Sequence, residues 1–161
     1  MGRTYLAGAV VLVLLSAGAC KQEPVFPDEP RIEFMRIWPD TVREYQDSIF
    51  ILFRFQDGDG DLGALGNGDL NLSLIDSRIS NGLTEEQATN RFSIPNLTPD
   101  TRIQSIQGEI TVKMPFTIVL PPLMQQDIRF QIKLWDRAGN LAKPMDGSEQ
   151  GVFTEYITVI R

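Results

Sequence analysis

Apolar and polar residues alternate with a period of two along most of the chain from residue 31 onward. This period is typical of β-strands that bury one face and expose the other. The clearest case is residues 127–135, where four apolar side chains face one way and mostly polar side chains face the other. The alternation predicts strands at residues 31–38, 48–56, 69–75, 108–119, 127–135 and 152–160.

Turn residues separate these segments and leave little room for helix. Thr84 is followed three residues later by Gln87, the pattern of a capping box, which predicts one short helix over residues 85–90. About seven strands joined mainly by turns predict an all-β fold, an antiparallel immunoglobulin-like β-sandwich with at most one short helix. Residues 31–161 are enough for one such domain.

Residues 1–19 have the organisation of a secretory signal peptide. Arg3 precedes an apolar run over residues 6–15, and small residues follow it. The run is too short to cross a bilayer as a helix, which takes about 20 apolar residues. Residues 17–20, Ala-Gly-Ala-Cys, resemble the lipobox of bacterial lipoproteins, and this resemblance implies a lipid anchor on Cys20. The alternative is an ordinary signal peptide with an inert cysteine.

Residues 20–30 are expected to form a tether between the lipid and the domain. Prolines at positions 24, 27 and 30 favour an extended chain of about 3.1 Å per residue, so ten residues would span roughly 30 Å. Lys21 stands where inner-membrane lipoproteins typically carry aspartate. We therefore expect a lipid anchor in the outer membrane of a bacterial cell envelope, facing either the periplasm or the cell surface.

The charge and the missing residue types restrict the function. The chain has 21 acidic and 15 basic residues, and removal of residues 1–19 leaves 14 basic ones and a formal net charge of −7. This acidity argues against a nucleic-acid partner. The sequence contains no histidine, so it lacks the most frequent general base and zinc ligand. Cys20 is the only cysteine, which excludes a disulfide within one chain.

The run Asp57-Gly58-Asp59-Gly60-Asp61 follows the apolar strand at 48–56 directly. Carboxylate oxygens are the ligands that Ca²⁺ prefers, so the run predicts a calcium site. It is not an EF-hand, because the required glycine and glutamate positions fall on Leu62 and Gly68. The alternative is a polar turn between two strands, for which Asp-Gly is a common sequence.

The turn at residues 136–140 supplies the remaining candidate ligands. In an immunoglobulin-like sandwich, the loop after the second strand and the loop before the last strand lie at the same end. We therefore expect Asp136 or Asn140 to join the three aspartates around one Ca²⁺, with Asp69 as a weaker candidate. In the alternative, Asp136 and Asn140 are turn residues that bond to their own backbone.

Two stretches also resemble a known group of proteins. Residues 55–63, Phe-Gln-Asp-Gly-Asp-Gly-Asp-Leu-Gly, and residues 134–140, Leu-Trp-Asp-Arg-Ala-Gly-Asn, resemble uncharacterised Bacteroidota lipoproteins with an immunoglobulin-like domain. The resemblance covers residues 31–161. It extends to the type of signal peptide at residues 1–19, though not to its sequence. It implies a fold and a compartment, and it brings no activity.

These observations favour a non-catalytic structural or interaction module of the cell envelope, braced by Ca²⁺. The alternative is an accessory protein that binds a glycan or peptide in nutrient uptake, for which Trp135 and Tyr45 are candidate rings for stacking against a ligand. Paired carboxylates can also hydrolyse glycosides, but Asp57 to Asp61 are crowded into one turn instead of flanking a cleft. We therefore expect no enzymatic activity.

Overall fold

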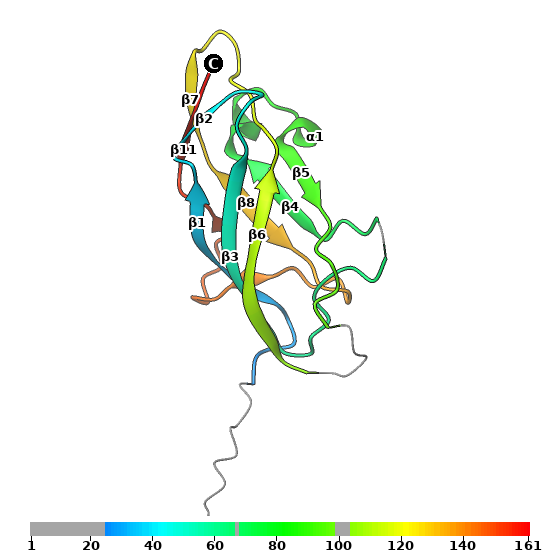
Figure 1. Cartoon of the computed structure of the whole chain (residues 1–161). Helices are drawn as coiled ribbons and strands as arrows, with labels where there is room; N and C mark the ends of the chain where they lie inside the picture. The colour runs from blue at the N-terminus through cyan, green and yellow to red at the C-terminus, as the bar shows by residue number, and fades with distance from the viewer. Residues whose placement is uncertain (1–24, 67, 99–103) are drawn as a thin grey trace, which may run out of the picture.

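The structure is a computed structural model that describes residues 25–66, 68–98 and 104–161. The described chain folds into an all-β sandwich, which confirms the predicted all-β sandwich class (Figure 1). None of its helices is both long and apolar enough to cross a membrane. The predicted signal peptide, Cys20 and the first residues of the tether lie outside the described residues.

The first sheet has the strand order β6-β3-β1-β9. Its members are β1 (Arg31–Trp38), β3 (Ile49–Asp57), β6 (Ile106–Met114) and the short β9 (Lys143–Pro144). Strand β3 pairs antiparallel with both β1 and β6, whereas β9 runs parallel to β1. The strands at 31–38 and 48–56 are confirmed to within one residue.

The second sheet has the order β10-β8-β4-β5, and all of its pairs are antiparallel. Its members are β4 (Leu72–Asp76), β5 (Thr89–Phe92), β8 (Phe130–Leu134) and β10 (Val152–Phe153). A third, smaller sheet has the order β2-β11-β7. It contains β2 (Thr41–Arg43), β7 (Gln125–Ile128) and β11 (Ile157–Ile160), and β11 runs parallel to β2.

The third sheet explains why two predicted strands are broken. Residues 127–135 form two strands, β7 and β8, separated at Arg129, and residues 152–160 form β10 and β11. In each case the chain pairs with one sheet over its first part and with another over its second. Between β7 and β8 the alternation of buried and half-buried side chains continues across Arg129, which is why the sequence alone reads as one strand there.

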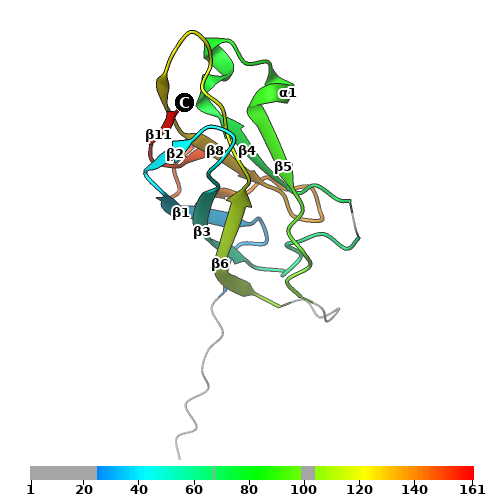
Figure 2. The same ribbon diagram turned by 45° about the horizontal axis from the view of Figure 1, so that its top comes forward.

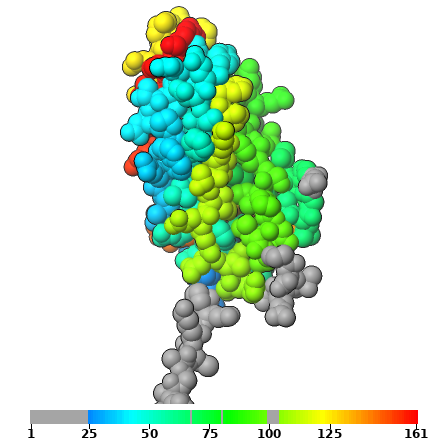
Figure 3. All heavy atoms as spheres, in the orientation of Figure 1, coloured from blue at the N-terminus to red at the C-terminus, as the bar shows by residue number. Residues whose placement is uncertain are grey.

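The core lies between the two larger sheets and follows the predicted alternation. Along β3 every second side chain from Ile49 to Asp57 is buried, while the residues between them are half-buried. Phe53 and Phe130 are the two largest fully buried side chains, one from each sheet. Burying a side chain of this size contributes roughly 1.5–3 kcal/mol. Strands β6 and β5, the free edges of the two sheets, lie side by side on the face seen in Figure 3.

The middle of the chain differs from the prediction. Helix α1 (Glu85–Ala88) has the expected capping box between Thr84 and Gln87, but it ends two residues early and continues into β5. A 3₁₀ turn, η1 (Ser77–Asn81), precedes it. The strand predicted at residues 69–75 places Leu70 on the same face as Leu72 and Leu74, but β4 begins only at Leu72 and Leu70 is 57% exposed.

Strand register accounts for Leu70, and proline accounts for the end of β6. The last pair between β4 and β8 joins Leu72 to Leu134, so Leu70 lies beyond the partner strand and has no sheet to pack against. Strand β6 ends at Met114, directly before Pro115, instead of continuing to residue 119. Proline cannot donate a ladder hydrogen bond, so it disfavours continuation of the strand.

The two ends of the described chain lie at opposite ends of the sandwich. Residues 25–30 enter at the end where β3 finishes, and the C-terminus lies at the other end beside β2 and β7 (Figures 1 and 2). The acidic run that follows β3 is therefore at the end through which the N-terminal segment enters.

Candidate metal centre

Asp57 is the last residue of β3 and continues the buried face of that strand. It has the same parity as Ile49, Ile51, Phe53 and Phe55, so the pleat directs its side chain inward. The side chain is fully buried, at 0% exposure. The sequence contained this signal, because an aspartate in register with four buried apolar residues reaches the protein interior.

The structure brings the carboxylates of Asp57, Asp59 and Asp61 together. One oxygen from each lies within 4.8 Å of the other two. The amide of Leu62 donates to Asp57 Oδ2 (2.9 Å), and the amide of Asp61 donates to Asp59 Oδ1 (3.3 Å). Asp57 Oδ1 and Asp61 Oδ1 are buried and have no hydrogen-bond partner among the described residues. The three aspartates form a cluster that could hold a metal ion.

Among the described residues the charges around the cluster are mainly repulsive, although Arg137 offsets part of the effect on Asp61. Burial, together with repulsion from Asp59 and Asp61, raises the pKa of Asp57 to about 7 from an ordinary value of 3.8. Burial also raises the pKa of Asp61, and the charges of Asp136 and Asp59 add to this effect. A proton or a bound cation can relieve the repulsion.

The loop after β3 lies beside the turn at 136–140, as the topology predicted. The amide of Ala138 donates to Asp61 Oδ2 (3.0 Å), and the amide of Arg137 donates to the Asp61 carbonyl (3.3 Å). Leu62 and Asp136 also form an isolated antiparallel bridge. The two loops are therefore joined through Asp61 and its neighbour.

Asp136 and Asn140 bond to each other. Asp136 Oδ1 accepts from the Asn140 amide, and Asp136 Oδ2 accepts from Asn140 Nδ2, both at 2.7 Å. Asp136 lies close enough to Asp61 to raise its pKa, but it does not belong to the cluster of three. A ligand role for either residue therefore stays a prediction. Asp69, the weaker candidate, lines a groove beside Trp135 instead.

Residues remote in sequence hold the backbone of the acidic loop. Thr98 Oγ1 donates to the Gly60 carbonyl (2.6 Å), and Ser105 Oγ donates to the Gly58 carbonyl (3.1 Å). The Arg137 guanidinium donates to Asn96 Oδ1 (3.1 Å) and to loop carbonyls. The sequence carried no local signal for Thr98, Ser105 or Asn96, because their partners are some 40 residues away.

The donor set decides which ions suit the cluster. Every available ligand atom is an oxygen, which favours a hard cation such as Ca²⁺ or Mg²⁺ over the metals that prefer nitrogen or sulfur.

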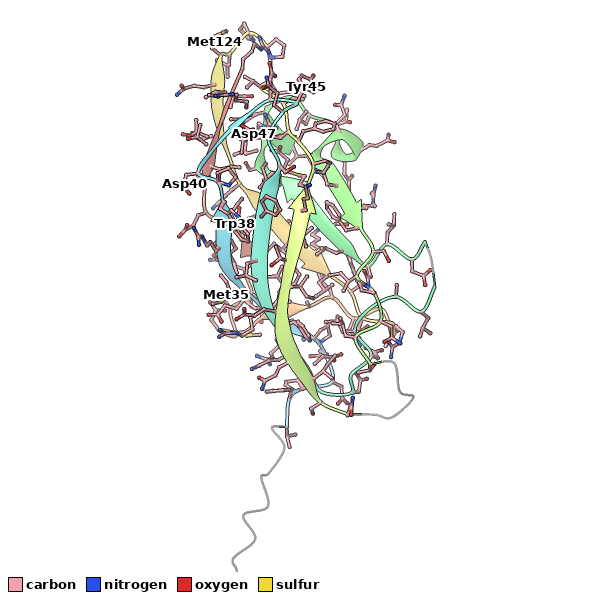
Figure 4. The ribbon with its side chains drawn as sticks, viewed as in Figure 1. Met35, Trp38, Asp40, Tyr45, Asp47 and Met124 are labelled. Atoms are coloured by element: carbon pink, nitrogen blue, oxygen red, sulfur yellow. The ribbon has the colours of Figure 1, made fainter. Side chains whose placement is uncertain are left out.

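The two predicted stacking residues lie in different places. Trp135 is half-buried and lines a groove of about 320 Å³ together with Leu65, Leu70 and Asp69, next to the acidic loop. Tyr45 is 66% exposed, has a positive φ of 60°, and lies at the opposite end of the sandwich, where its ring is 5.9 Å from that of Phe116 (Figure 4). They cannot contribute to one small binding site.

Comparisons with protein-family models, with curated proteins and with solved structures found no match to this chain.

Proposed function

We propose that this protein is a non-catalytic lipoprotein of the bacterial cell envelope, whose sandwich is a structural or interaction module braced by Ca²⁺. The observation that carries the proposal is a pair of buried carboxylate oxygens, Asp57 Oδ1 and Asp61 Oδ1, that have no hydrogen-bond partner in the described part of the chain. Buried polar atoms almost always have partners, and a cation held by the cluster would supply one. We also propose that the protein belongs to the group of Bacteroidota lipoproteins that residues 55–63 and 134–140 resemble.

Ca²⁺ is the favoured ion because of the setting of the cluster. The ligands lie in a glycine-containing loop, which suits the flexible coordination of Ca²⁺ better than the strict octahedron of Mg²⁺. A bound ion would neutralise the repulsion among Asp57, Asp59 and Asp61 and would fix the turn at 136–140 through Ala138. Extracellular modules bind Ca²⁺ with dissociation constants on the order of 10⁻⁴–10⁻³ M.

The test is a thermal melt of residues 21–161, which include every described residue, in EDTA and then in millimolar Ca²⁺ or Mg²⁺. At a tenfold excess over Kd, a ligand that binds only the folded state adds about 1.4 kcal/mol. We expect a rise in Tm of several degrees with Ca²⁺ that Mg²⁺ does not reproduce. Asp57→Asn should abolish it, whereas Asp40→Asn, at an exposed position outside the cluster, should not. An unchanged wild-type Tm contradicts the proposal.

The lipid anchor is tested separately. Mass spectrometry of the protein extracted from outer membranes should find a lipid on Cys20, and Cys20→Ser should release the protein into the soluble fraction. A membrane-free wild-type protein would contradict anchoring while leaving the calcium site untouched.

One observation favours a second candidate function, glycan binding. The groove beside Trp135 combines an aromatic wall with the polar side chains of Asp69 and Arg137, the composition of a sugar site. Screening against neutral and acidic oligosaccharides tests it. Binding that Trp135→Ala abolishes and Tyr45→Ala retains would support this function, whereas no binding by the wild type would contradict it.

A further inference from the structure

The N-terminal segment is docked on the acidic loop. The amide of Gly58 donates to the Pro27 carbonyl (2.9 Å), so the residue between Asp57 and Asp59 receives the incoming chain. A Cβ at position 58 would lie 2.3 Å from the Phe26 carbonyl oxygen and 2.6 Å from that of Pro27. No side chain fits there, so glycine at this position is required by the close approach of the two segments.

Further contacts continue along the same segment. Lys143 Nζ bonds to Glu29 Oε2 (2.8 Å), and the Lys143 amide donates to the Pro30 carbonyl (2.9 Å). Phe26 is half-buried and Pro30 is buried. Residues 26–30 therefore pack on the sandwich instead of extending freely from it. Their contact at Pro27 is with Gly58, which lies between two aspartates of the cluster.

We infer that cation binding by Asp57, Asp59 and Asp61 controls the docking of residues 26–30, so that Ca²⁺ sets how rigidly the domain is held on its N-terminal segment. The inference rests on the calcium site of the proposed function. Without a cation, repulsion among the carboxylates on both sides of Gly58 loosens the loop that presents the Gly58 amide. With the cation bound, that amide is fixed in the position in which it bonds to Pro27.

Linkage makes the inference quantitative. If Ca²⁺ favours docking by a given factor, docking must favour Ca²⁺ binding by the same factor. A variant that undocks the segment without touching a carboxylate must therefore bind Ca²⁺ more weakly. Gly58→Ala is such a variant, because its methyl group meets the Phe26 and Pro27 carbonyls. Gly66→Ala is the matched control, because its nearest neighbour would be 4.0 Å away and its φ is not positive.

The experiment measures amide hydrogen exchange in residues 21–161, in EDTA and at a Ca²⁺ concentration tenfold above Kd, with calorimetric titration of Ca²⁺ into each variant. We expect Ca²⁺ to slow exchange at Gly58 and across residues 26–29 up to about tenfold in the wild type, the limit set by occupancy. Gly58→Ala should lose the protection of residues 26–29 and raise the Kd for Ca²⁺, and Gly66→Ala should behave as the wild type.

The outcomes separate the two proposals. If Ca²⁺ binds the wild type but leaves exchange at Gly58 and residues 26–29 unchanged, this inference is overturned and the calcium site stands. If titration detects no Ca²⁺ binding, both fall. Should Gly58→Ala not fold, Lys143→Ala removes the side-chain contact with Glu29 at an exposed position. Loss of protection of residues 26–29 in that variant with an unaltered Kd for Ca²⁺ would also count against the inference, because linkage requires the two to change together.

Discussion

The backbone amide of Ala138 donates a hydrogen bond of 3.0 Å to the carboxylate of Asp61, across 77 positions of sequence. This bond joins the loop after β3 to the turn after β8. The two carboxylate oxygens of Asp61 differ. Oδ2 accepts a hydrogen bond from the neighbouring turn, whereas the buried Oδ1 has no partner among the described residues. A cation bound at Oδ1 would act on both loops.

The metal-free protein should lose stability as the pH rises from about 4 to about 7. The pKa of Asp57 is about 7 in the folded state and 3.8 ordinarily, so its contribution is fully present below pH 4 and disappears as the pH approaches 7. At 1.36 kcal/mol per unit of pKa, the loss is on the order of a few kcal/mol. Urea unfolding in EDTA between pH 4 and 8 measures it. The chain has no histidine to obscure this range.

Asp57→Asn should flatten this pH dependence in EDTA, and Asp40→Asn should leave it as in the wild type. Ca²⁺ competes with the proton for the same carboxylate, so the rise in Tm that Ca²⁺ produces should be larger at pH 8 than at pH 6. A rise that is larger at pH 6 would contradict a role for Asp57 as a ligand.

The aspartates should differ in their effect on Ca²⁺ affinity. Asp57→Asn and Asp61→Asn each remove the charge from a carboxylate with one oxygen that no described residue bonds, so each should weaken binding at least about tenfold. Asp136→Asn should weaken it less, because both Asp136 oxygens already accept from Asn140. Calorimetric titration measures all three. A loss at Asp136 equal to that at Asp57 would place Asp136 among the direct ligands.

The buried ion pair of Asp76 and Arg78 should be costly to break. Its oxygen and nitrogen are 2.6 Å apart, and the two side chains are about 5% exposed. Arg78→Ala leaves the Asp76 charge buried without its partner and should cost about 3–5 kcal/mol of unfolding free energy. Arg54→Ala is the control, because Arg54 is 41% exposed and its pairs should be worth below about 1 kcal/mol. Similar losses in the two variants would refute this assignment.

The core should show the same contrast between buried and exposed aromatic rings. Phe53 is fully buried in the centre of β3, so Phe53→Ala should cost about 3–5 kcal/mol. Phe116 is 50% exposed and contacts the ring of Tyr45, so Phe116→Ala should cost markedly less. Denaturant unfolding compares them, and a small loss at Phe53 would be inconsistent with the described packing.

Local pattern determined more of the candidate site than of the topology. The position of Asp57 in register with Phe53 and Phe55 already directs its carboxylate inward, because side chains alternate strictly along a strand. The capping box of Thr84 and Gln87 is likewise local, because its two hydrogen bonds join residues only three positions apart. By contrast, Thr98 and Ser105 reach the loop through contacts that no short-range pattern encodes.

The sequence by itself determined the all-β class, the two long strands that begin the sandwich, the short capped helix and the clustering of three aspartates in one loop. These follow from side-chain alternation and from neighbours in the chain. Only the tertiary structure decided that residues 127–135 divide at Arg129 between two sheets, that Leu70 is exposed, and that Pro27 rests on Gly58. The physical reason is that strand pairing and loop packing join residues far apart in sequence. Where a distant segment is the partner, its position decides which residues are paired and buried, and the local pattern does not.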